Sequence, residues 1–139
     1  MSNVIYLGFD FGYSRIGVAV GQSITASARP LTTLKANQGQ PDWQEITKLI
    51  KQWRPAELVV GLPTTIAGKA QYTTDPAKQF AKHLREDYGL PVHLVDERLT
   101  TKEARANLFD VGGYKELKKA EIDAHAAALI LEQWLRDIP

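Results

Sequence analysis

Acidic residues at three separate places in the chain have the chemistry to hold metal ions that act on a phosphodiester. Asp10 ends a short apolar run, Asp96 and Glu97 follow another, and Asp123 opens the last amphipathic segment. Two hard cations about 4 Å apart can activate water and neutralise charge on a leaving oxygen, and they prefer carboxylate oxygens as ligands. The sequence therefore predicts a metal-dependent hydrolytic site built from three or four acids.

Asp10 is the strongest candidate because it ends a hydrophobic run between Gly8 and Gly12. An acid in that position is costly unless a cation uses it, and ligands of open α/β sheets gather at the carboxyl ends of strands. The flanking glycines would also let a nucleic-acid backbone approach closely. A hairpin aspartate that accepts hydrogen bonds from turn amides is the structural alternative.

The other acids are less distinctive. Strand alternation puts Asp96 and Glu97 on opposite faces, and either is a reasonable partner for Arg98. Asp123, in the first turn of a helix, is explained better by the helix dipole when it is taken without the other two acids. The residues alone leave both questions open.

Other metal and redox chemistry is disfavoured. The chain has no cysteine, which excludes disulfides, cysteine zinc sites and a thiol nucleophile, and fits a reducing compartment. The three histidines, His83, His93 and His125, lack the paired spacing of a histidine metal site. The N-terminal residues show neither a signal peptide nor a membrane span, so we expect a cytoplasmic protein with no membrane partner.

Five strands and four helices are expected around these acids. Apolar runs and alternation predict strands over residues 4–9, 16–21, 26–34, 57–61 and 91–95. Helical spacing and caps predict helices that start at Asp42, at Asp75 and at Thr100, and a last one over residues 119–136 whose inward side carries Ile122, Ala126, Leu129, Ile130 and Gln133 or Trp134. The order β-β-β-α-β-α-β-α-α indicates an antiparallel meander followed by two parallel strands. It predicts a ribonuclease-H-like α/β fold with a five-stranded mixed sheet flanked by helices.

Composition and charge limit the number of domains and the arguments for a nucleic-acid partner. A length of 139 residues with 44% apolar content predicts one domain, over residues 1–139. The net charge of +1 is too small to argue for nucleic-acid binding. Basic residues do cluster, and these clusters are Lys48, Lys51 and Arg54, then Lys78, Lys82 and Arg85, and six more between Arg98 and Lys119. Solvated helix faces explain the helical clusters equally well.

Several motifs in order resemble one bacterial family over essentially the whole chain. They are Phe9-Asp10-Phe11-Gly12 with Ile16-Gly17-Val18-Ala19, then Val60-Gly61-Leu62-Pro63, Asp96-Glu97-Arg98-Leu99-Thr100-Thr101, and Asp123-Ala124-His125-Ala126-Ala127. Together they resemble the YqgF (RuvX) family, described both as Holliday junction resolvases and as nucleases of precursor 16S ribosomal RNA.

The resemblance implies that Asp10, Glu97 and Asp123 are the catalytic acids and the ligands of Mg²⁺ or Mn²⁺, and it favours Glu97 over Asp96. In a two-metal site, Asp10 would bridge the ions while the other two acids each complete one shell. The candidate substrate-binding residues are Gly12, Arg15, Arg98, Thr100 and Thr101. Arg98 would either orient Glu97 or touch a phosphate.

Two departures from related enzymes bear on the substrate. Related junction resolvases carry an acid at the end of the fourth strand, where this chain has Gly61-Leu62-Pro63. Family members commonly have Asn and Asp in the next loop, where residues 64–68 here are Thr-Thr-Ile-Ala-Gly. Substrate contacts made by that loop in other members are therefore in doubt here.

By resemblance, the expected task is maturation of the 5′ end of 16S ribosomal RNA, with precursor RNA or pre-ribosomal particles as partners. A Holliday junction resolvase, which would need a symmetric dimer, is the first alternative. A non-catalytic nucleic-acid-binding factor in transcription or ribosome assembly is the second. An ATPase of the actin type has an Asp-x-Gly loop too, but 139 residues leave no room for its two lobes. Whether the protein is a monomer or a homodimer is left open.

Overall fold

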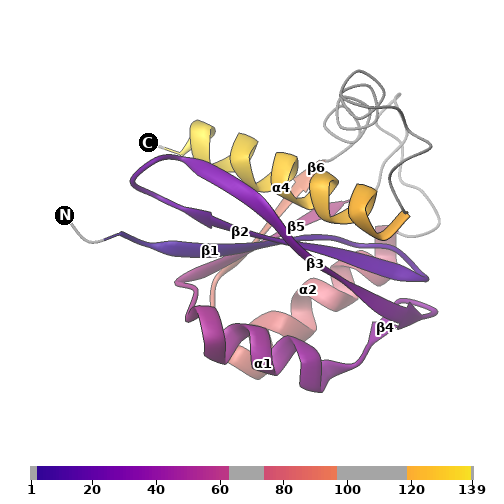
Figure 1. The fold of residues 1–139 in the computed structure, drawn as a ribbon. Coiled ribbons are helices and arrows are strands. Elements are labelled where there is room, and N and C mark those ends of the chain that lie inside the picture. The colour runs from indigo at the N-terminus through magenta and orange to yellow at the C-terminus, as the bar shows by residue number, and fades with distance from the viewer. Residues whose placement is uncertain (1–2, 63–73, 97–118, 139) are drawn as a thin grey trace.

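A six-stranded mixed sheet separates two layers of helices (Figure 1). The computed structural model describes residues 3–62, 74–96 and 119–138. Its strands are β1 (Ile5–Asp10), β2 (Arg15–Gln22), β3 (Ser27–Asn37), β4 (Gln40–Pro41), β5 (Glu57–Leu62) and β6 (Val92–Asp96). Its helices are α1 (Trp43–Trp53), α2 (Thr74–Tyr88) and α4 (Lys119–Asp137). Helices α1 and α2 cover one face of the sheet, and α4 covers the other.

The strand order is β4-β3-β2-β1-β5-β6. Strands β1 to β4 form an antiparallel meander, and β5 and β6 run parallel to β1. The carboxyl ends of β1, β5 and β6 therefore lie at the same edge of the sheet, as the sequence predicts. None of the helices within the described ranges is long and apolar enough to cross a membrane.

The predicted strand count was wrong by one. The sixth strand, β4, is a two-residue pairing of Gln40 and Pro41 with the end of β3, which itself extends to Asn37. A pairing this short has no hydrophobic alternation for a sequence pattern to detect. The helix expected to start at Thr100 lies outside the described residues.

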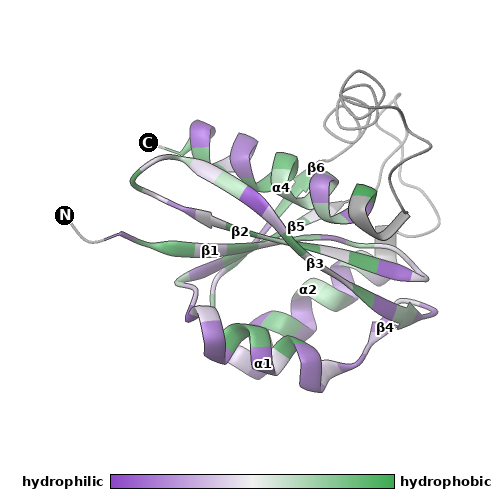
Figure 2. Cartoon of the chain, in the orientation of Figure 1, coloured by the Kyte–Doolittle hydropathy of each residue, from purple (hydrophilic) through white to green (hydrophobic). Residues whose placement is uncertain are grey.

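The α1–α2 layer packs through aromatic side chains. Phe80 of α2 contacts Phe9, Phe11 and Trp43, with ring centroids 5.4 to 5.6 Å apart. Asp42 caps α1, as predicted, by accepting a hydrogen bond from the Gln44 backbone N–H at 3.0 Å. The hydrophobic side of α1 faces the sheet in Figure 2. The core cluster between this layer and the sheet contains most of the large buried apolar residues.

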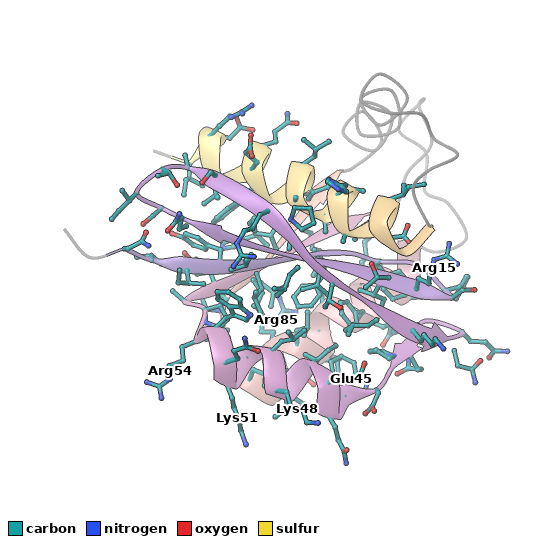
Figure 3. The ribbon with its side chains drawn as sticks, viewed as in Figure 1. Arg15, Glu45, Lys48, Lys51, Arg54 and Arg85 are labelled. Atoms are coloured by element: carbon teal, nitrogen blue, oxygen red, sulfur yellow. The ribbon has the colours of Figure 1, made fainter. Side chains whose placement is uncertain are left out.

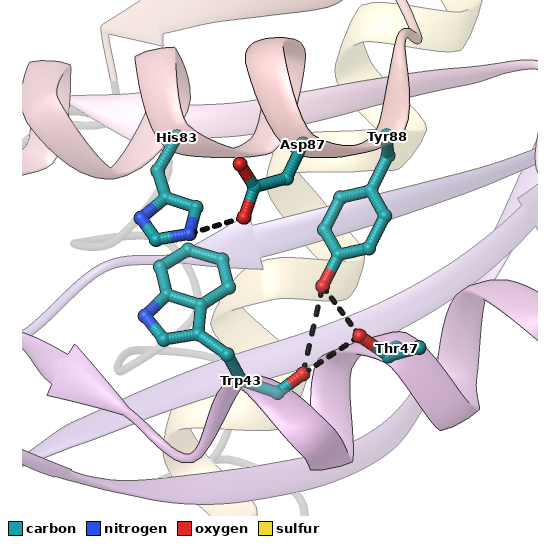
Figure 4. Close-up of polar contacts among 5 residues, drawn as sticks. All are labelled: Trp43, Thr47, His83, Asp87 and Tyr88. Carbon is teal, nitrogen blue, oxygen red and sulfur yellow. Dashed lines mark hydrogen bonds and ion pairs between the residues drawn. The ribbon is translucent and has the colours of Figure 1, made fainter.

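Polar groups also join α1 to α2 at the outer edge of this layer (Figure 4). The His83 ring stacks on Trp43, with 3.5 Å between ring centroids and 8° between planes. Within α2, His83 Nε2 lies 2.6 Å from an Asp87 carboxylate oxygen, which orients the stacked ring. The Tyr88 hydroxyl lies 2.8 Å from Thr47 Oγ1. These contacts fix the relative position of the two helices.

Helix α4 lies directly on β1 and β2 and runs antiparallel to β1. Tyr6, early in β1, makes an edge-to-face contact with Trp134 near the end of α4, with centroids 5.4 Å apart. Two residues further on, a Cβ on Gly8 would lie 2.9 Å from Leu131 Cβ. The start of α4 therefore lies over the end of β1, because later residues of the strand contact earlier residues of the helix.

The predicted inward face of α4 was partly right. Ile122, Ala126 and Ile130 are buried, and Trp134, the predicted alternative to Gln133, is half-buried and packs against Tyr6, whereas Leu129 is half-buried and Gln133 is exposed. Ala127, Leu131 and Leu135 are the further buried residues that pack on the sheet. Apolar residues surround much of this helix, so the 3.6-residue period alone does not identify the face that meets the sheet.

Candidate active site

Asp10 lies at the carboxyl edge of the sheet, on the face covered by α4. It is the last residue of β1, and its Cα partners are Gly17 on β2 and Gly61 on β5. Side chains alternate along a strand, so Asp10 shares its face with Tyr6 and Gly8, both of which contact α4. The Asp10 side chain is half-buried. It is therefore positioned beneath the first turns of α4.

Gly17 brings the backbone of α4 into direct contact with the sheet beside Asp10. A Cβ on Gly17 would lie 2.0 Å from the Asp123 carbonyl oxygen and 2.9 Å from the Ala124 nitrogen. No side chain fits in that space, so only glycine allows the approach. Because Gly17 is also the cross-strand partner of Asp10, it places Asp10 and Asp123 on either side of one residue.

Asp123 is paired with a cation in this structure. Arg15 Nε donates a hydrogen bond to Asp123 Oδ2 at 2.7 Å, and the two side chains are 39% and 25% exposed. Arg15 is the first residue of β2, so it reaches Asp123 from the same edge that carries Asp10. Figure 3 shows Arg15 at this end of the sheet. The arginine neutralises the aspartate and orients its carboxylate.

Gly12, the other candidate for substrate binding in the hairpin, has a local structural reason to be glycine. A Cβ there would lie 2.6 Å from the Arg15 carbonyl oxygen. Gly12 therefore permits the hairpin that brings Arg15 toward Asp123, whether or not it also touches a substrate.

The remaining predicted site residues cannot be placed. Strand β6 ends at Asp96, whose Cα partner is Leu62 at the end of β5. Glu97 follows Asp96 in the sequence and lies outside the described residues, as do Arg98, Thr100, Thr101 and the loop over residues 64–68. Within the described ranges, no three or more His, Asp or Glu side chains gather as a metal site would require. The structure thus brings together Asp10, Asp123 and Arg15.

The opposite end of the α4 face holds a separate polar cluster. His93 Nε2 lies 2.8 Å from Glu57 Oε1, and its ring lies against Trp134 with centroids 4.8 Å apart. Burial, and secondarily the charge of Glu57, raises the pKa of Tyr6 above its ordinary value. These groups lie toward the starts of β1 and β5, away from Asp10. His93 is thus engaged in packing and a carboxylate contact, and His125 is exposed.

The basic clusters of α1 and α2 lie away from the candidate site. Lys48, Lys51 and Arg54 are exposed and point outward from α1, on the opposite face of the sheet from α4 (Figure 3). On α2, Lys82 makes an ion pair with Glu86 at 3.9 Å. Their exposure is compatible with solvated helix faces and places them on the other side of the sheet from Asp10, whereas the basic residues from Arg98 to Lys118 lie outside the described residues.

Sequence reasoning missed two relationships at the site. It treated Arg15 as a substrate contact, without its pairing to Asp123. It also gave Gly17 no role beyond its motif. A usable pattern was present, because Gly17, Ala19 and Gly21 alternate along one face of β2, and a row of small residues on a strand indicates close approach of another backbone.

Comparison with known proteins gives three consistent results. The family model described as RuvX, Holliday junction resolvase, matches residues 4–137. A protein of Legionella pneumophila (strain Lens) named "Putative pre-16S rRNA nuclease" is 60% identical over 136 residues, covering 98% of each chain. A protein of the same name from Proteus mirabilis is 51% identical over 134 residues, covering 96% of each chain. These matches confirm the resemblance seen in the sequence.

Solved structures with a similar fold include resolvases. The Thermus thermophilus RuvC in complex with a Holliday junction has a TM-score of 0.58 at 19% identity, covering 95% of this chain and 94% of that one. The yeast mitochondrial resolvase Ydc2 has a TM-score of 0.54 at 14% identity, covering 94% and 77%. At these identities the likeness concerns the fold alone, and it confirms the predicted ribonuclease-H-like class.

Proposed function

Because this chain belongs to the RuvX family of Holliday junction resolvases, and is therefore a nuclease that hydrolyses phosphodiester bonds, we propose that it processes the 5′ end of precursor 16S ribosomal RNA. The substrate follows from the name shared by the relatives that are 51% to 60% identical over nearly the whole chain. Magnesium or manganese is the proposed cofactor. The protein is proposed to act in the cytoplasm, where this substrate occurs.

One observation supports this proposal most directly. Asp10 and Asp123, which lie 113 positions apart in the sequence, flank Gly17 at the carboxyl edge of the sheet. Carboxylate oxygens are the donors that Mg²⁺ and Mn²⁺ prefer, so these two side chains fit such an ion. Glu97, next in sequence after the end of β6, is the proposed third acid.

The proposed roles follow from this arrangement. When bound, the metal ions would activate the attacking water and neutralise charge on the leaving oxygen. Asp10 and Asp123 would hold the ions from the strand and the helix respectively, and Glu97 would complete the set. Arg15, whose Nε lies 2.7 Å from Asp123 Oδ2, places a positive charge at the edge that a phosphate backbone must approach.

A test of the proposal compares cleavage of labelled precursor 16S RNA and of a four-way DNA junction, each with Mg²⁺, with Mn²⁺ and with chelator. We expect the wild type to cut the RNA, and Asp10→Asn, Glu97→Gln and Asp123→Asn each to lower the rate by at least ~100-fold, which is the order seen when transition-state charge stabilisation is lost. Asp137→Asn, an exposed acid at the far end of α4, is the matched control and should cut normally.

Two other results would redirect the assignment. Cutting of the junction alone would favour a resolvase, which the description of the family model supports. RNA binding without metal-dependent cutting of either substrate would favour a non-catalytic factor. Cutting that survives Glu97→Gln would remove Glu97 from the proposed site.

A further inference from the structure

A polar groove begins beside the hairpin that follows Asp10 and extends away from the candidate site. Its walls are the hairpin residues Tyr13 and Ser14, the β3–β4 turn and the start of α2, and it encloses about 830 Å³. Four amide side chains line it: Asn37, Gln38, Gln40 and Gln79. All four residues are exposed. We call this feature the amide groove.

The wall formed by the turn is held rigidly against the hairpin. The Gly39 N–H donates to the Tyr13 carbonyl at 2.9 Å, and the Ala36 N–H donates to the Ser14 carbonyl at 2.9 Å. Gly39 has a φ of 82°, and a Cβ there would lie 2.8 Å from the Phe11 ring. Since Phe11 directly follows Asp10, the position of the groove is coupled to the position of the candidate catalytic acid.

The chemistry of the amide groove differs from that of a phosphate-binding surface. None of the described residues that line it is charged. Amides both donate and accept hydrogen bonds, which matches the edges of bases and the ribose 2′-hydroxyl, whereas an ionised phosphodiester only accepts them. Tyr13 adds an aromatic ring, the side-chain type on which unpaired bases stack.

A second groove of about 400 Å³ continues the first, with Gly39, Gln40 and Gln79 common to both. Here Lys82 is offset by Glu86 and Asp87, and the stacked rings of Trp43 and His83 form part of the wall. The described residues of the two grooves together therefore carry one positive and two negative charges, with none of them in the amide groove itself.

Building on the proposed function, we propose that the amide groove binds unpaired ribonucleotides of the RNA substrate next to the bond that is cut. The groove borders the hairpin that follows Asp10 and lies on the side of the sheet that α1 and α2 cover, so a strand that leaves the acids across the carboxyl edge of the sheet would reach it. It recognises bases and ribose rather than phosphates, and so contributes affinity that does not depend on salt.

Site-directed trapping tests the location of the strand. The chain has no cysteine, so Gln38→Cys and Gln79→Cys each introduce a single thiol. The probe is an oligoribonucleotide from the 5′ region of precursor 16S RNA, with a disulfide-activated tether on one nucleotide beside the cleavage position. We expect trapping at either groove position to be at least ~10-fold faster than with Gln52→Cys, an exposed α1 residue outside the groove, because bound reactants meet at millimolar effective concentration. Equal rates at all three positions would overturn the proposal.

Affinity measurements test the chemistry. Fluorescence anisotropy with the same oligoribonucleotide, without the tether, should show the Asn37→Ala/Gln79→Ala double variant binding about tenfold more weakly, as expected for two lost neutral hydrogen bonds. The slope of log affinity against log salt should equal that of the wild type, because no charge is removed. Gln44→Ala/Gln52→Ala, which removes two exposed amides of α1, is the matched control. Unchanged affinity in the groove variant would refute RNA binding in the amide groove. A changed salt slope would refute the proposal that the groove binds RNA through uncharged groups.

Two comparisons separate this inference from the proposed function. If the wild type cuts precursor RNA but the groove cysteines do not trap it, the nuclease assignment stands and the groove assignment fails. If the groove cysteines trap RNA but the wild type does not cut it, the groove assignment stands and the proposed processing function fails. Equal affinity and equal trapping with DNA of the same sequence would overturn the assignment of RNA as the occupant.

Discussion

Arg15 Nε and Asp123 Oδ2 lie 2.7 Å apart, although the two residues are 108 positions apart in the chain. The side chain proposed as a metal ligand is therefore already paired with a cation supplied by the protein. A guanidinium this close occupies one carboxylate oxygen and adds positive charge where a metal ion would bind. We infer that Arg15 competes with the metal for Asp123.

The first prediction follows from that competition. Arg15→Gln should tighten Mn²⁺ binding about fivefold, on the order of 1 kcal/mol, the upper range for a partly exposed ion pair. Isothermal titration with Mn²⁺ measures this without any nuclease assay. Lys35→Gln is the matched control, because Lys35 is the cross-strand partner of Arg15 and its removal changes nearby charge without breaking the Asp123 pair. Weaker Mn²⁺ binding in Arg15→Gln would show that the arginine holds Asp123 ready for the metal instead.

The second prediction concerns Gly17. In Gly17→Ala the new Cβ meets the Asp123 carbonyl, which as backbone cannot turn aside, so α4 must shift. Overpacking of this kind costs roughly 1–3 kcal/mol of the free energy of unfolding, and RNA cleavage should fall even in the fraction that folds. Urea denaturation and the cleavage assay measure the two effects.

Gly21→Ala provides the comparison for Gly17. Its Cβ would meet the flexible ends of Leu131 and Leu135 at 2.9 Å, which can adjust, although the Ser27 carbonyl oxygen lies 3.1 Å away. The loss of stability should be smaller and cleavage should be preserved. Equal effects of the two substitutions on cleavage would refute a special role for Gly17.

The third prediction is a pH dependence at the far end of α4. The pKa of Tyr6 is raised in the folded protein by burial and by Glu57, so between the ordinary tyrosine value of about 10 and the raised value only the unfolded chain loses the proton. The folded state then binds more protons, and the free energy of unfolding must fall as pH rises through that window. Below it, both states are protonated and no dependence arises.

Tyr6→Phe removes this effect. Its free energy of unfolding should therefore fall less steeply than that of the wild type as the pH is raised from about 9 to 11, a range that brackets the ordinary tyrosine pKa. Chemical denaturation at a series of pH values gives the slopes, and Tyr13→Phe controls for the loss of a phenol elsewhere. Parallel slopes for the wild type and Tyr6→Phe would show that Tyr6 does not cause the pH dependence of the free energy of unfolding.

The fourth prediction tests the polar join between α1 and α2. The Tyr88 hydroxyl and Thr47 Oγ1 lie 2.8 Å apart, and Thr47 also donates to the Trp43 carbonyl at 3.0 Å. Tyr88→Phe and Thr47→Val should each lower stability, and a double-mutant cycle should give a coupling of about 0.5–1.5 kcal/mol. Strictly additive effects would mean that this hydrogen bond contributes nothing to stability.

Much of the fold was predictable because its segments have strong local patterns. The β5 run is apolar after Glu57, and Asp42 marks the start of α1, so both were placed within a residue or two. Strand β4 was missed because a two-residue pairing is specified by the turn at Gln38 and Gly39, not by hydrophobic period.

The sequence predicts the candidate site as a set of acids, of which Asp10 and Asp123 lie within the described residues, but it does not predict their geometry. The position of Asp10 at the end of an apolar run carried enough information to single it out. The Arg15–Asp123 pair depends on how α4 lies across β2, a tertiary relationship between segments far apart in sequence. No local pattern specifies it, and the resemblance to a family supplies residue identities without contacts.

The contact at Gly17 has a consequence for how sequences of this fold can diverge. The separation of strand and helix beside Asp10 is determined by backbone atoms meeting backbone atoms, with no intervening side chain whose size could change it. Substitutions elsewhere in the core can alter volumes and tilt distant elements while this spacing stays constant. Side chains elsewhere in the core can therefore vary in size across related sequences without changing this spacing, whereas any side chain at position 17 would change it.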